Sequence, residues 1–397
     1  MRRVVVTGIG ICCDLGNGKE EVFTRLKAGK NGMRQLDNLD IEPLRRKYFG
    51  KSPIAEKMIE QPSDSERIEY MCMDVIEEAL ADSYLTKEDI EQIDDRFALS
   101  LATSLTGIQH IGKSLVYNNE KGDWLLHSRQ LLNHIMMKVG VNGSCYLTSS
   151  ACAAGTAGAG LGFDLIKNDE ADIALVGGGD HLSMFSIFGF NTLNTLSKEV
   201  CKPFDLERDG INLGEGACFF IFEELEHALN RKADIYGEIL GYGLGNDAYN
   251  MTSPDPKGIG AKAVMNMALK EGNVPEDEGL YINAHGTGTK VNDIMEIQAV
   301  SELGKEREIF LSSTKSMTGH CLGAAGSIEL AFTIVSLMNQ QTWPTIHSNL
   351  DIVEDNKILD YSKCPFNFKY ALSNSFAFAG HAASILVKKY ETFRGEV

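Results

Sequence analysis

Short apolar runs and helix-like segments alternate along almost the whole chain. Strand-like runs occur at residues 3–7, 97–101, 173–177, 217–222, 280–284, 309–311 and 384–387. Helical spacing of apolar residues occurs between them, at 69–83, 151–167, 259–272 and 323–338. Strands that alternate with helices of this size are typical of βαβ units, so the sequence predicts a layered α/β fold.

We expect one compact body made of two similar halves. A β-branched strand at 4–7 opens the first half and is expected to leave into a turn marked by Gly8 and Gly10. A second strand-forming stretch, 235–240, is expected to open the second half. The predicted halves are residues 1–234 and 235–397.

Composition and charge exclude several classes of protein. The 397 residues are 43% hydrophobic and 23% charged, which excludes a disordered chain and a collagen-like repeat. A formal net charge of −17 argues against a general attraction for nucleic acid or an anionic membrane. No run approaches the ~20 apolar residues that cross a bilayer, and the amino terminus lacks the apolar region of a signal peptide. We therefore expect a cytoplasmic protein that binds neither nucleic acid nor membrane.

The nine cysteines do not form a disulfide or zinc pattern. Their number is odd and no C-x-x-C pair occurs. We expect most of them to be reduced and buried, and we expect no metal site.

A single cysteine separates a predicted strand from a helix of small residues. The strand ends in hydroxyl residues, Cys152 follows, and residues 153–160 read Ala-Ala-Gly-Thr-Ala-Gly-Ala-Gly. A thiol at the amino-terminal end of a helix meets free N–H groups and the positive end of the helix dipole, which stabilise a thiolate. A buried core cysteine is the alternative, but the strand–cysteine–helix setting favours a nucleophile.

Two further segments place a histidine after a predicted strand. His285 ends the run at 281–284 and is followed by Gly-Thr-Gly-Thr, whose flexible backbone and hydroxyls suit a polar ligand. An incidental histidine in a turn is an equal alternative for this segment alone. His320 ends the loop at 312–320, which precedes another helix of small residues.

Lys315 lies in the same loop as His320, and Glu329 lies inside the apolar helix that follows. A charge in an apolar helix needs a buried partner, and Lys315 is the obvious candidate. Two roles remain open for this pair: it could only connect the loop to the helix, or it could take part in catalysis.

One cysteine and two histidines at the ends of different strands suit nucleophilic acyl transfer. A tight loop at 373–381, which contains Phe378, could add backbone N–H groups to such a site. Metal binding is a weaker alternative because no pair of these residues has ligand spacing. The chain contains neither GxSxG nor a GxGxxG after a strand, so the hydrolase and dinucleotide-binding hypotheses fall away.

In this order, the four segments resemble those of the β-ketoacyl-acyl carrier protein synthases, most nearly the type II elongating enzymes. Further matching segments lie at residues 2–10, 202–205, 207–210, 213–216, 247–249 and 251–254. The resemblance extends over nearly the whole chain. It implies the thiolase fold, with two similar halves in a five-layered α-β-α-β-α arrangement that usually forms a dimer.

The resemblance implies a role for each of the singled-out residues. Cys152 would be the nucleophile that accepts an acyl group from a carrier-protein thioester. His285 and His320 would promote malonyl decarboxylation and stabilise the enolate. Lys315 and Glu329 would orient the histidines.

The resemblance also implies how substrates are held. The backbone N–H groups of Cys152 and Phe378 would form the oxyanion hole, and Phe378 would be the gating aromatic. Thr287 and Thr289 would contact the phosphopantetheine of acyl carrier protein, and Lys202 would be a basic position for carrier docking. No further cofactor is implied.

Several residues depart from the pattern of this family. Ala377 and Ala379 replace the glycines around the gate, so we expect either a stiffer gate or, equally, two alanines at ordinary negative φ. Ser65, Glu66 and Glu69 occupy the region where relatives carry basic residues for the carrier.

The sequence therefore predicts an acyltransferase that condenses acyl and malonyl groups in fatty-acid or specialised polyketide or polyene synthesis. The alternative is a non-catalytic or decarboxylating chain-length partner subunit, although such partners lack the nucleophile. A degradative thiolase would need a second catalytic cysteine near the carboxyl end. The expected partners are acyl carrier protein and either a second copy of the chain or a related ketosynthase-like subunit.

Overall fold

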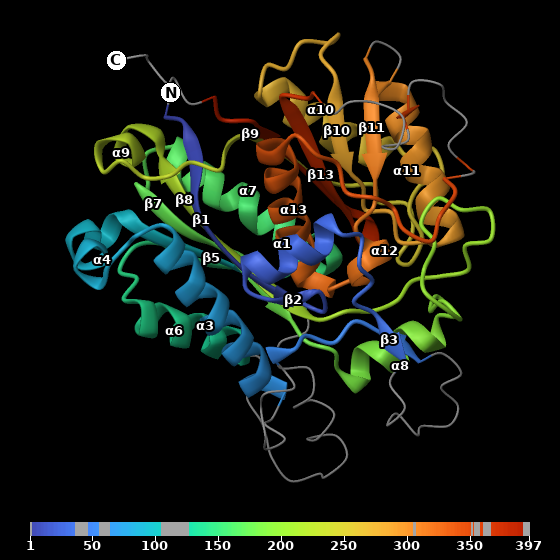
Figure 1. Cartoon of the computed structure of the whole chain (residues 1–397), viewed down its shortest axis with the longest axis horizontal. Coiled ribbons are helices and arrows are strands. Elements are labelled where there is room, and N and C mark those ends of the chain that lie inside the picture. Colours follow the sequence, from blue (N-terminus) through green and yellow to red (C-terminus); the bar gives the residue numbers. More distant parts are fainter. Residues whose placement is uncertain are drawn as a thin grey trace.

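The structure is a computed structural model. It describes residues 2–35, 47–54, 64–104, 127–304, 307–350, 352, 358–359 and 367–391. Within these residues, two groups of strands and three layers of helices form one body (Figure 1). All eight cysteines of the described residues are free thiols.

The first group of strands has the order β6-β5-β7-β8-β1. Its members are β1 (Val4–Cys13), β5 (Phe97–Ala102), β6 (Cys145–Thr148), β7 (Ile173–Asp180) and β8 (Gly216–Glu224). β5 is parallel to β6 and β7, whereas β8 is antiparallel to both β7 and β1. β5, β7 and β8 are buried along their whole length, as the apolar runs predict.

The second group repeats this pattern in the order β12-β11-β10-β13-β14-β9. Its members are β9 (Gly237–Asn246), β10 (Leu280–Asn283), β11 (Ile309–Ser312), β12 (Ile358–Leu359), β13 (Tyr370–Phe376) and β14 (His381–Lys388). β10 is parallel to β11 and β13, and β14 is antiparallel to β13 and β9. A short antiparallel pairing of β1 with β9 joins the two groups.

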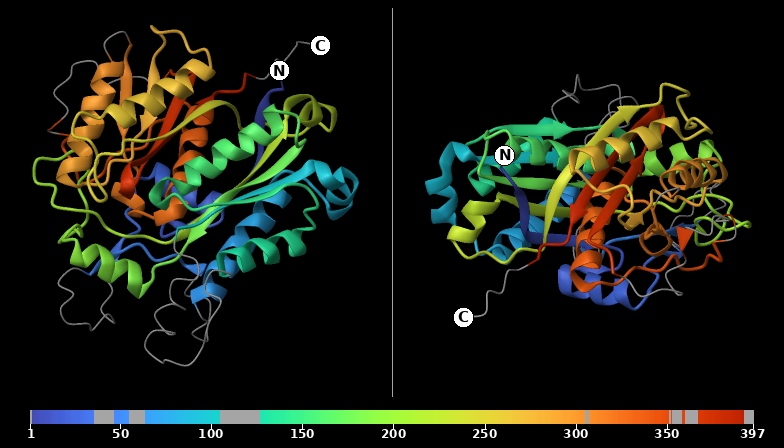
Figure 2. Two further views of the ribbon diagram at one scale, coloured as in Figure 1. Left: turned by 180° about the vertical axis from the view of Figure 1, so that it is seen from behind. Right: turned by 90° about the horizontal axis from the view of Figure 1, so that it is seen from above.

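Helices cover both outer faces of the strands and fill the space between them (Figures 1 and 2). α3 (Asp64–Asp82) and α6 (His127–Val139) pack on the first group, and α10 (Ile259–Glu271) and α11 (Lys290–Leu303) lie on the second. α7 (Ala154–Lys167) and α13 (Ala325–Asn339) lie between the two groups. The expected five-layered α/β thiolase fold is thereby confirmed, while the boundary between residues 234 and 235 stays a prediction.

The remaining elements are short. They are β2 (Gly16–Asn17), β3 (Arg34–Gln35), β4 (Tyr48–Phe49), α1 (Lys19–Lys27), α4 (Lys87–Ile93), α8 (Met184–Thr192), α9 (Leu225–Asn230) and α12 (Lys315–Thr318).

β1 extends further than the sequence predicts. The strand continues through Gly8 and Gly10 as far as Cys13, where we expect a turn. A Cβ at Gly10 would lie 1.8 Å from the Val75 carbonyl oxygen, and one at Gly8 would lie 2.3 Å from that of Ala79. These glycines therefore allow α3 to pack against the strand backbone, and they do not turn the chain.

The two central helices contact each other through their small residues. A Cβ on Gly155 would lie 2.6 Å from the Ser327 backbone nitrogen, and one on Gly326 would lie 2.5 Å from that of Thr156. The single-turn segments that precede the helices, Ala151–Ala153 and Leu322–Ala324, are also in contact. This close approach brings the segments of Cys152 and His320 together.

One stretch, Leu322–Asn339, is long and apolar enough by length and composition to span a membrane, but 89% of it is buried inside the fold. A helix that is apolar all round and buried by protein is typical of the core of a large domain. The expectation that no run approaches membrane-spanning length is therefore wrong for this stretch, which consists of the single-turn segment Leu322–Ala324 and the buried helix α13.

Candidate active site

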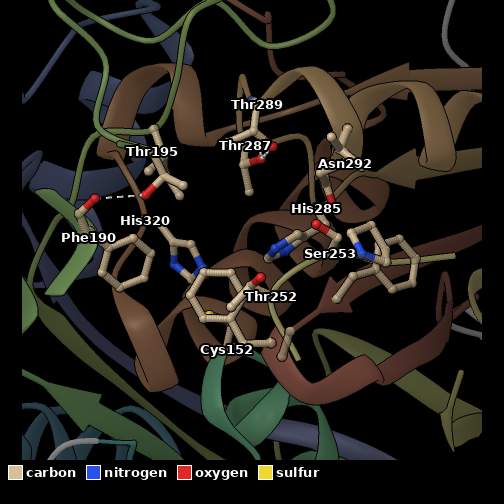
Figure 3. Close-up of a pocket in the computed structure, with 16 residues that line it drawn as sticks. Cys152, Phe190, Thr195, Thr252, Ser253, His285, Thr287, Thr289, Asn292 and His320 are labelled. Carbon is tan, nitrogen blue, oxygen red and sulfur yellow. Dashed lines mark hydrogen bonds between the residues drawn. The ribbon is translucent and has the colours of Figure 1, made fainter. Parts of the chain in front are cut away.

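The four segments singled out in the sequence converge on one cavity of about 180 Å³. Its lining includes Cys152, His285, Thr287, Thr289, His320 and Phe378. Figure 3 shows the two imidazole rings pointing toward one another near Cys152. The structure thus brings together a thiol, two imidazoles and two hydroxyls that are far apart in the sequence.

Cys152 lies in the single-turn segment Ala151–Ala153, immediately before α7. Burial raises the pKa of its thiol to about 12, although the Lys315 ammonium acts in the opposite direction. The loss of hydration therefore outweighs the nearby positive charge in setting this pKa. The raised pKa favours the neutral thiol of Cys152 over the thiolate.

Backbone contacts fix the position and tautomer of His320. Its N–H donates to the Asn212 carbonyl oxygen at 2.8 Å, and its own carbonyl oxygen accepts from the Gly214 N–H at 2.9 Å. The Leu322 N–H donates to His320 Nδ1 at 3.0 Å. Because Nδ1 accepts a hydrogen bond, the ring proton lies on Nε2, which has no protein partner among the described residues.

His285 is held through its backbone by a buried carboxylate. The N–H groups of His285 and Gly286 donate to Glu296 Oε1 and Oε2 at 2.9 and 2.8 Å. The Asn374 side-chain amide donates to the same carboxylate at 3.2 Å. Burial raises the pKa of Glu296 to about 7.

Sequence reasoning missed Glu296, although a signal for it exists. Glu296 lies one helical turn before Ala299 and Val300, on the buried face of α11. An acidic residue in register with apolar ones indicates a buried carboxylate that needs donors. Here those donors are the N–H groups that fix His285.

The two histidines face each other as neutral rings. The centroids of His285 and His320 are 5.3 Å apart, and the ring planes are nearly perpendicular at 86°. Burial, together with the nearby Lys315 ammonium, holds the pKa of both imidazoles well below the usual range. Neutral imidazoles at this position can donate hydrogen bonds to a developing negative charge.

Lys315 and Glu329 form the buried pair that the sequence suggests. Lys315 Nζ donates to Glu329 Oε1 at 2.5 Å, and both side chains are buried. Burial raises the pKa of Glu329 to about 7, opposed by Lys315. The described lining of the cavity includes neither residue. The Lys315 charge therefore acts on the site through its field.

Ala379 adopts a left-handed backbone conformation in the loop that carries Phe378. Its φ is 60° and its ψ 21°, whereas Ala377 has an ordinary φ of −127°. The Ala379 N–H donates to the Met251 carbonyl oxygen at 2.8 Å, and Asn246 Nδ2 donates to the Ala379 carbonyl oxygen at 2.7 Å. The alternative of two alanines at negative φ is therefore wrong for Ala379.

The Phe378 ring stacks on Phe190, with centroids 5.5 Å apart and an interplanar angle of 27°. Both rings line the cavity. The N–H of Ala377 donates to the His381 carbonyl oxygen at 2.7 Å, and that of Ala379 is also engaged. Within the described residues, the Phe378 N–H between them has no acceptor.

Several hydroxyl side chains line the cavity. Thr287 Oγ1 and Thr289 Oγ1 lie 2.9 Å apart. Thr195, Thr252 and Ser253 line the same cavity and were not singled out individually from the sequence. A lining of apolar and hydroxyl side chains suits an extended chain that carries amide groups.

The residues discussed for carrier docking lie outside the cavity. Lys202 is half-buried and its Nζ lies 3.4 Å from Glu207 Oε2. Glu69 pairs with Lys138 and with His134, at 3.0 Å in both cases. The family resemblance also implies that residues 105–152 line the acyl pocket and dimer seam and that this stretch is shortened here. Residues 105–126 of it lie outside the described residues.

Comparison with known proteins gives a family for both parts of the chain. Residues 1–228 match the family described as beta-ketoacyl synthase, N-terminal domain, and residues 236–349 match its C-terminal domain. The 3-oxoacyl-acyl-carrier-protein synthase 2 of Staphylococcus aureus (strain COL) is 32% identical over 98% of this chain and 99% of its own.

Solved structures agree with this relationship. A beta-ketoacyl synthase from Burkholderia phymatum STM815 superposes with a TM-score of 0.86 at 30% identity, covering 98% of this chain and 100% of its own. A ketosynthase bound to a hexaketide, in complex with its type II polyketide acyl carrier protein, gives 0.87 at 29% identity, with the same coverage. Family matches to most of the chain, together with a full-length relative above 30% identity, show that this chain belongs to the β-ketoacyl synthases, the acyltransferases that form 3-oxoacyl chains by condensation.

Proposed function

We propose that Cys152 carries the growing acyl chain and that His285 and His320 drive decarboxylative condensation with malonyl-acyl carrier protein. This proposal rests on one observation: the thiol of Cys152 and the neutral imidazoles of His285 and His320 line the same cavity. The fixed Nε2–H tautomer of His320 supports a donor role in particular.

In the first step, the Cys152 sulfur attacks the thioester carbonyl of an acyl-carrier. A bond forms from sulfur to the acyl carbon, and the bond to the phosphopantetheine sulfur breaks. The proton of the Cys152 thiol ends on the departing phosphopantetheine thiol. The N–H groups of Cys152 and Phe378 hold the transient oxyanion, a contribution of about 3 kcal/mol for each donor.

In the second step, malonyl-carrier loses CO2. The carbon–carbon bond to the carboxylate breaks, and its electron pair enters the thioester as an enolate. The Nε2–H of His320 and the imidazole of His285 stabilise the enolate oxygen as donors. Loss of CO2 supplies the carbanion, so no strong base is needed. Lys315 and Glu329 act as positioning residues that keep both rings neutral and in place.

In the third step, the enolate carbon attacks the Cys152 thioester. The new carbon–carbon bond gives a β-ketoacyl chain on the carrier, and the Cys152 thiolate leaves. It takes a proton from water, which its high pKa favours. The resting thiol is thereby restored for the next cycle.

Phosphopantetheine is the group that delivers both substrates. Thr287 and Thr289 are proposed to hydrogen bond with its amides, since their hydroxyls line the cavity. An acyl carrier protein would supply this arm, and Lys202 is a proposed contact for it. A relative in complex with its acyl carrier protein supports the same kind of partner here.

A dimer is the proposed assembly, formed either with a second copy or with a related subunit. Among the strands of the described residues, β6 ends the order, and its residues are only partly buried. An open edge strand of this kind offers unpaired backbone groups to a partner. The ishigamide ketosynthase/chain length factor, with a TM-score of 0.85 at 29% identity, supports a related subunit as one possible partner. We propose a cytoplasmic location for the assembly.

The test is to mix the protein with hexanoyl- and malonyl-acyl carrier protein and to weigh the carrier products. We expect a 3-oxooctanoyl-carrier to form, and we expect Cys152→Ala to form none. Release of CO2 from malonyl-carrier without any condensed product would instead indicate a chain-length partner subunit.

A further inference from the structure

The mouth of the active-site cavity opens beside the two outer helices of the second half. Val291, at the start of α11, and Thr252 both line the cavity and are exposed to solvent. A carrier whose prosthetic arm enters here must rest on the surface around these residues. This constraint rests on the proposed function.

Exposed apolar side chains gather on this rim. The exposed fractions are 78% for Met251, 46% for Val291, 53% for Ile294 and 60% for Ile259. Val291 and Ile294 are one turn apart on α11, and Ile259 begins α10. Single exposed apolar residues are ordinary, but a cluster that borders an active-site mouth indicates a contact surface for another protein.

Lysines accompany these apolar residues. Lys257 and Lys290 are exposed and form no ion pair within the described part of the chain. Lys262, on the next turn of α10, pairs with Glu302 at 3.1 Å. Of the nearby acids, Asp255 is partly buried and accepts the Lys257 N–H, so this rim keeps two unpaired cations on a protein of net charge −17.

A groove between α10 and α11 continues from the rim. It has a volume of about 570 Å³ and is lined by Lys257, Ile259, Lys262, Ala263, Asn266, Gln298 and Glu302. The groove is therefore apolar along part of its floor and cationic along one margin. Its dimensions and chemistry suit side chains from an acidic amphipathic helix.

Among the described outer helices of the first half, α6 carries one exposed cation without an ion pair, Arg129, whereas Arg67 of α3 is paired with Glu215. On α6, Lys138 pairs with Glu69 of α3, which also binds His134. Carboxylates of a docking partner would therefore meet an anion there. Two unpaired lysines beside the cavity mouth, Lys257 and Lys290, favour the second half over the single Arg129.

We propose that the α10–α11 surface, defined by Met251, Lys257, Ile259, Lys290, Val291 and Ile294, docks the acidic acyl carrier protein. An acidic carrier helix lies along the groove, with its carboxylates on Lys257 and Lys290 and its apolar face on Ile259 and Ile294. The carrier is thereby held next to the mouth through which its arm reaches Cys152.

The test combines a double charge reversal with a matched control. Lys257→Glu with Lys290→Glu changes the proposed surface, whereas Lys87→Glu with Lys232→Glu changes two exposed lysines near α4 and α9, away from α10 and α11 (Figure 1). The dissociation constant for holo-acyl carrier protein is measured by interferometry at 50 mM salt. Acylation of Cys152 by hexanoyl-pantetheine, which has no carrier, is measured separately.

We expect the double reversal to weaken carrier binding about tenfold and to leave acylation by hexanoyl-pantetheine unchanged. We expect the control pair to bind within about twofold of the parent. Equal weakening in both pairs, or unchanged binding in the first, would overturn the docking surface. A halved particle mass in the first pair would also overturn it, because a second copy would then occupy the surface.

Failure of the proposed function would give a different result from failure of the docking surface. In that case hexanoyl-pantetheine would not acylate the unmodified protein, while the dissociation constants would still decide whether the carrier docks here.

Discussion

The Leu322 backbone N–H donates a 3.0 Å hydrogen bond to Nδ1 of His320. Leu322 itself has a left-handed φ of 54°, so the backbone adopts a costly conformation at this contact. The consequence is a single tautomer, with the proton on Nε2. A donor is thus set in place before substrate arrives.

Replacement of His320 by alanine removes this donor. We expect malonyl decarboxylation to fall about 10²- to 10³-fold, the usual effect of losing one donor to a developing oxyanion. His320→Gln should recover part of the rate, because its amide N–H can reach a position close to that of Nε2. Release of CO2 from malonyl-carrier is the measurement. A parental rate in the alanine variant would refute the assignment.

Lys315 and Glu329 allow a structural role to be separated from a catalytic one. Lys315→Met leaves the Glu329 carboxylate buried and unpaired, so we expect the free energy of unfolding to fall by about 3–5 kcal/mol. The double variant Lys315→Met/Glu329→Met should regain most of this stability, because two apolar side chains replace the pair. Its decarboxylation should stay low. Full recovery of both properties would show that the pair only ties the loop to α13.

Ala379 and Ala377 form a matched pair for testing backbone strain. Ala379→Gly removes a Cβ at φ 60°, and we expect the free energy of unfolding to rise by about 1 kcal/mol. Ala377→Gly, at φ −127°, should lower it by up to about 1 kcal/mol through the greater freedom of the unfolded chain. Urea unfolding measures both.

The same pair tests the gate. We expect Ala379→Gly to accept a wider range of acyl chain lengths, since the loop that carries Phe378 gains conformations. Ala377→Gly should keep the parental profile. Identical profiles in all three proteins would mean that strain at Ala379 does not limit the gate.

The sequence predicts the architecture well where a pattern is local. The apolar runs at 97–101 and 217–222 become β5 and β8 because each is buried on both faces. Gly8 and Gly10 led to the wrong prediction of a turn. Here they lie inside β1 and allow α3 to pack closely against the strand. A local pattern does not say which helix will lie against a strand.

In the candidate site, too, residues marked by a local pattern are predictable and residues placed by tertiary contacts are not. Cys152, His285 and His320 are marked by strand ends and small-residue helices, and their arrangement follows from the family resemblance. The carboxylate of Glu296 reaches His285 only through the tertiary placement of α11, which the sequence does not specify. The left-handed Ala379 depends on a bond to Met251, more than a hundred residues away.

Glu296 gives the protein a characteristic pH dependence. Its pKa rises from 4.5 to about 7 on folding, so the folded state binds this proton more tightly than the unfolded state. The associated stability is fully present below pH 4.5 and is lost as the pH rises through about 7. Glu296→Gln lacks this titration, so its free energy of unfolding should vary less between these pH values. Parallel pH profiles for parent and variant would contradict the assignment.

The acyl-enzyme itself is the most direct test of the account. The protein is incubated with hexanoyl-pantetheine, and its intact mass and peptide masses are recorded for the parent, Cys152→Ala and His285→Ala/His320→Ala. We predict one hexanoyl group on Cys152 in the parent and in the double histidine variant, and none in Cys152→Ala. An acyl group that remains at parental stoichiometry in Cys152→Ala, or that maps to another residue, would contradict the central claim.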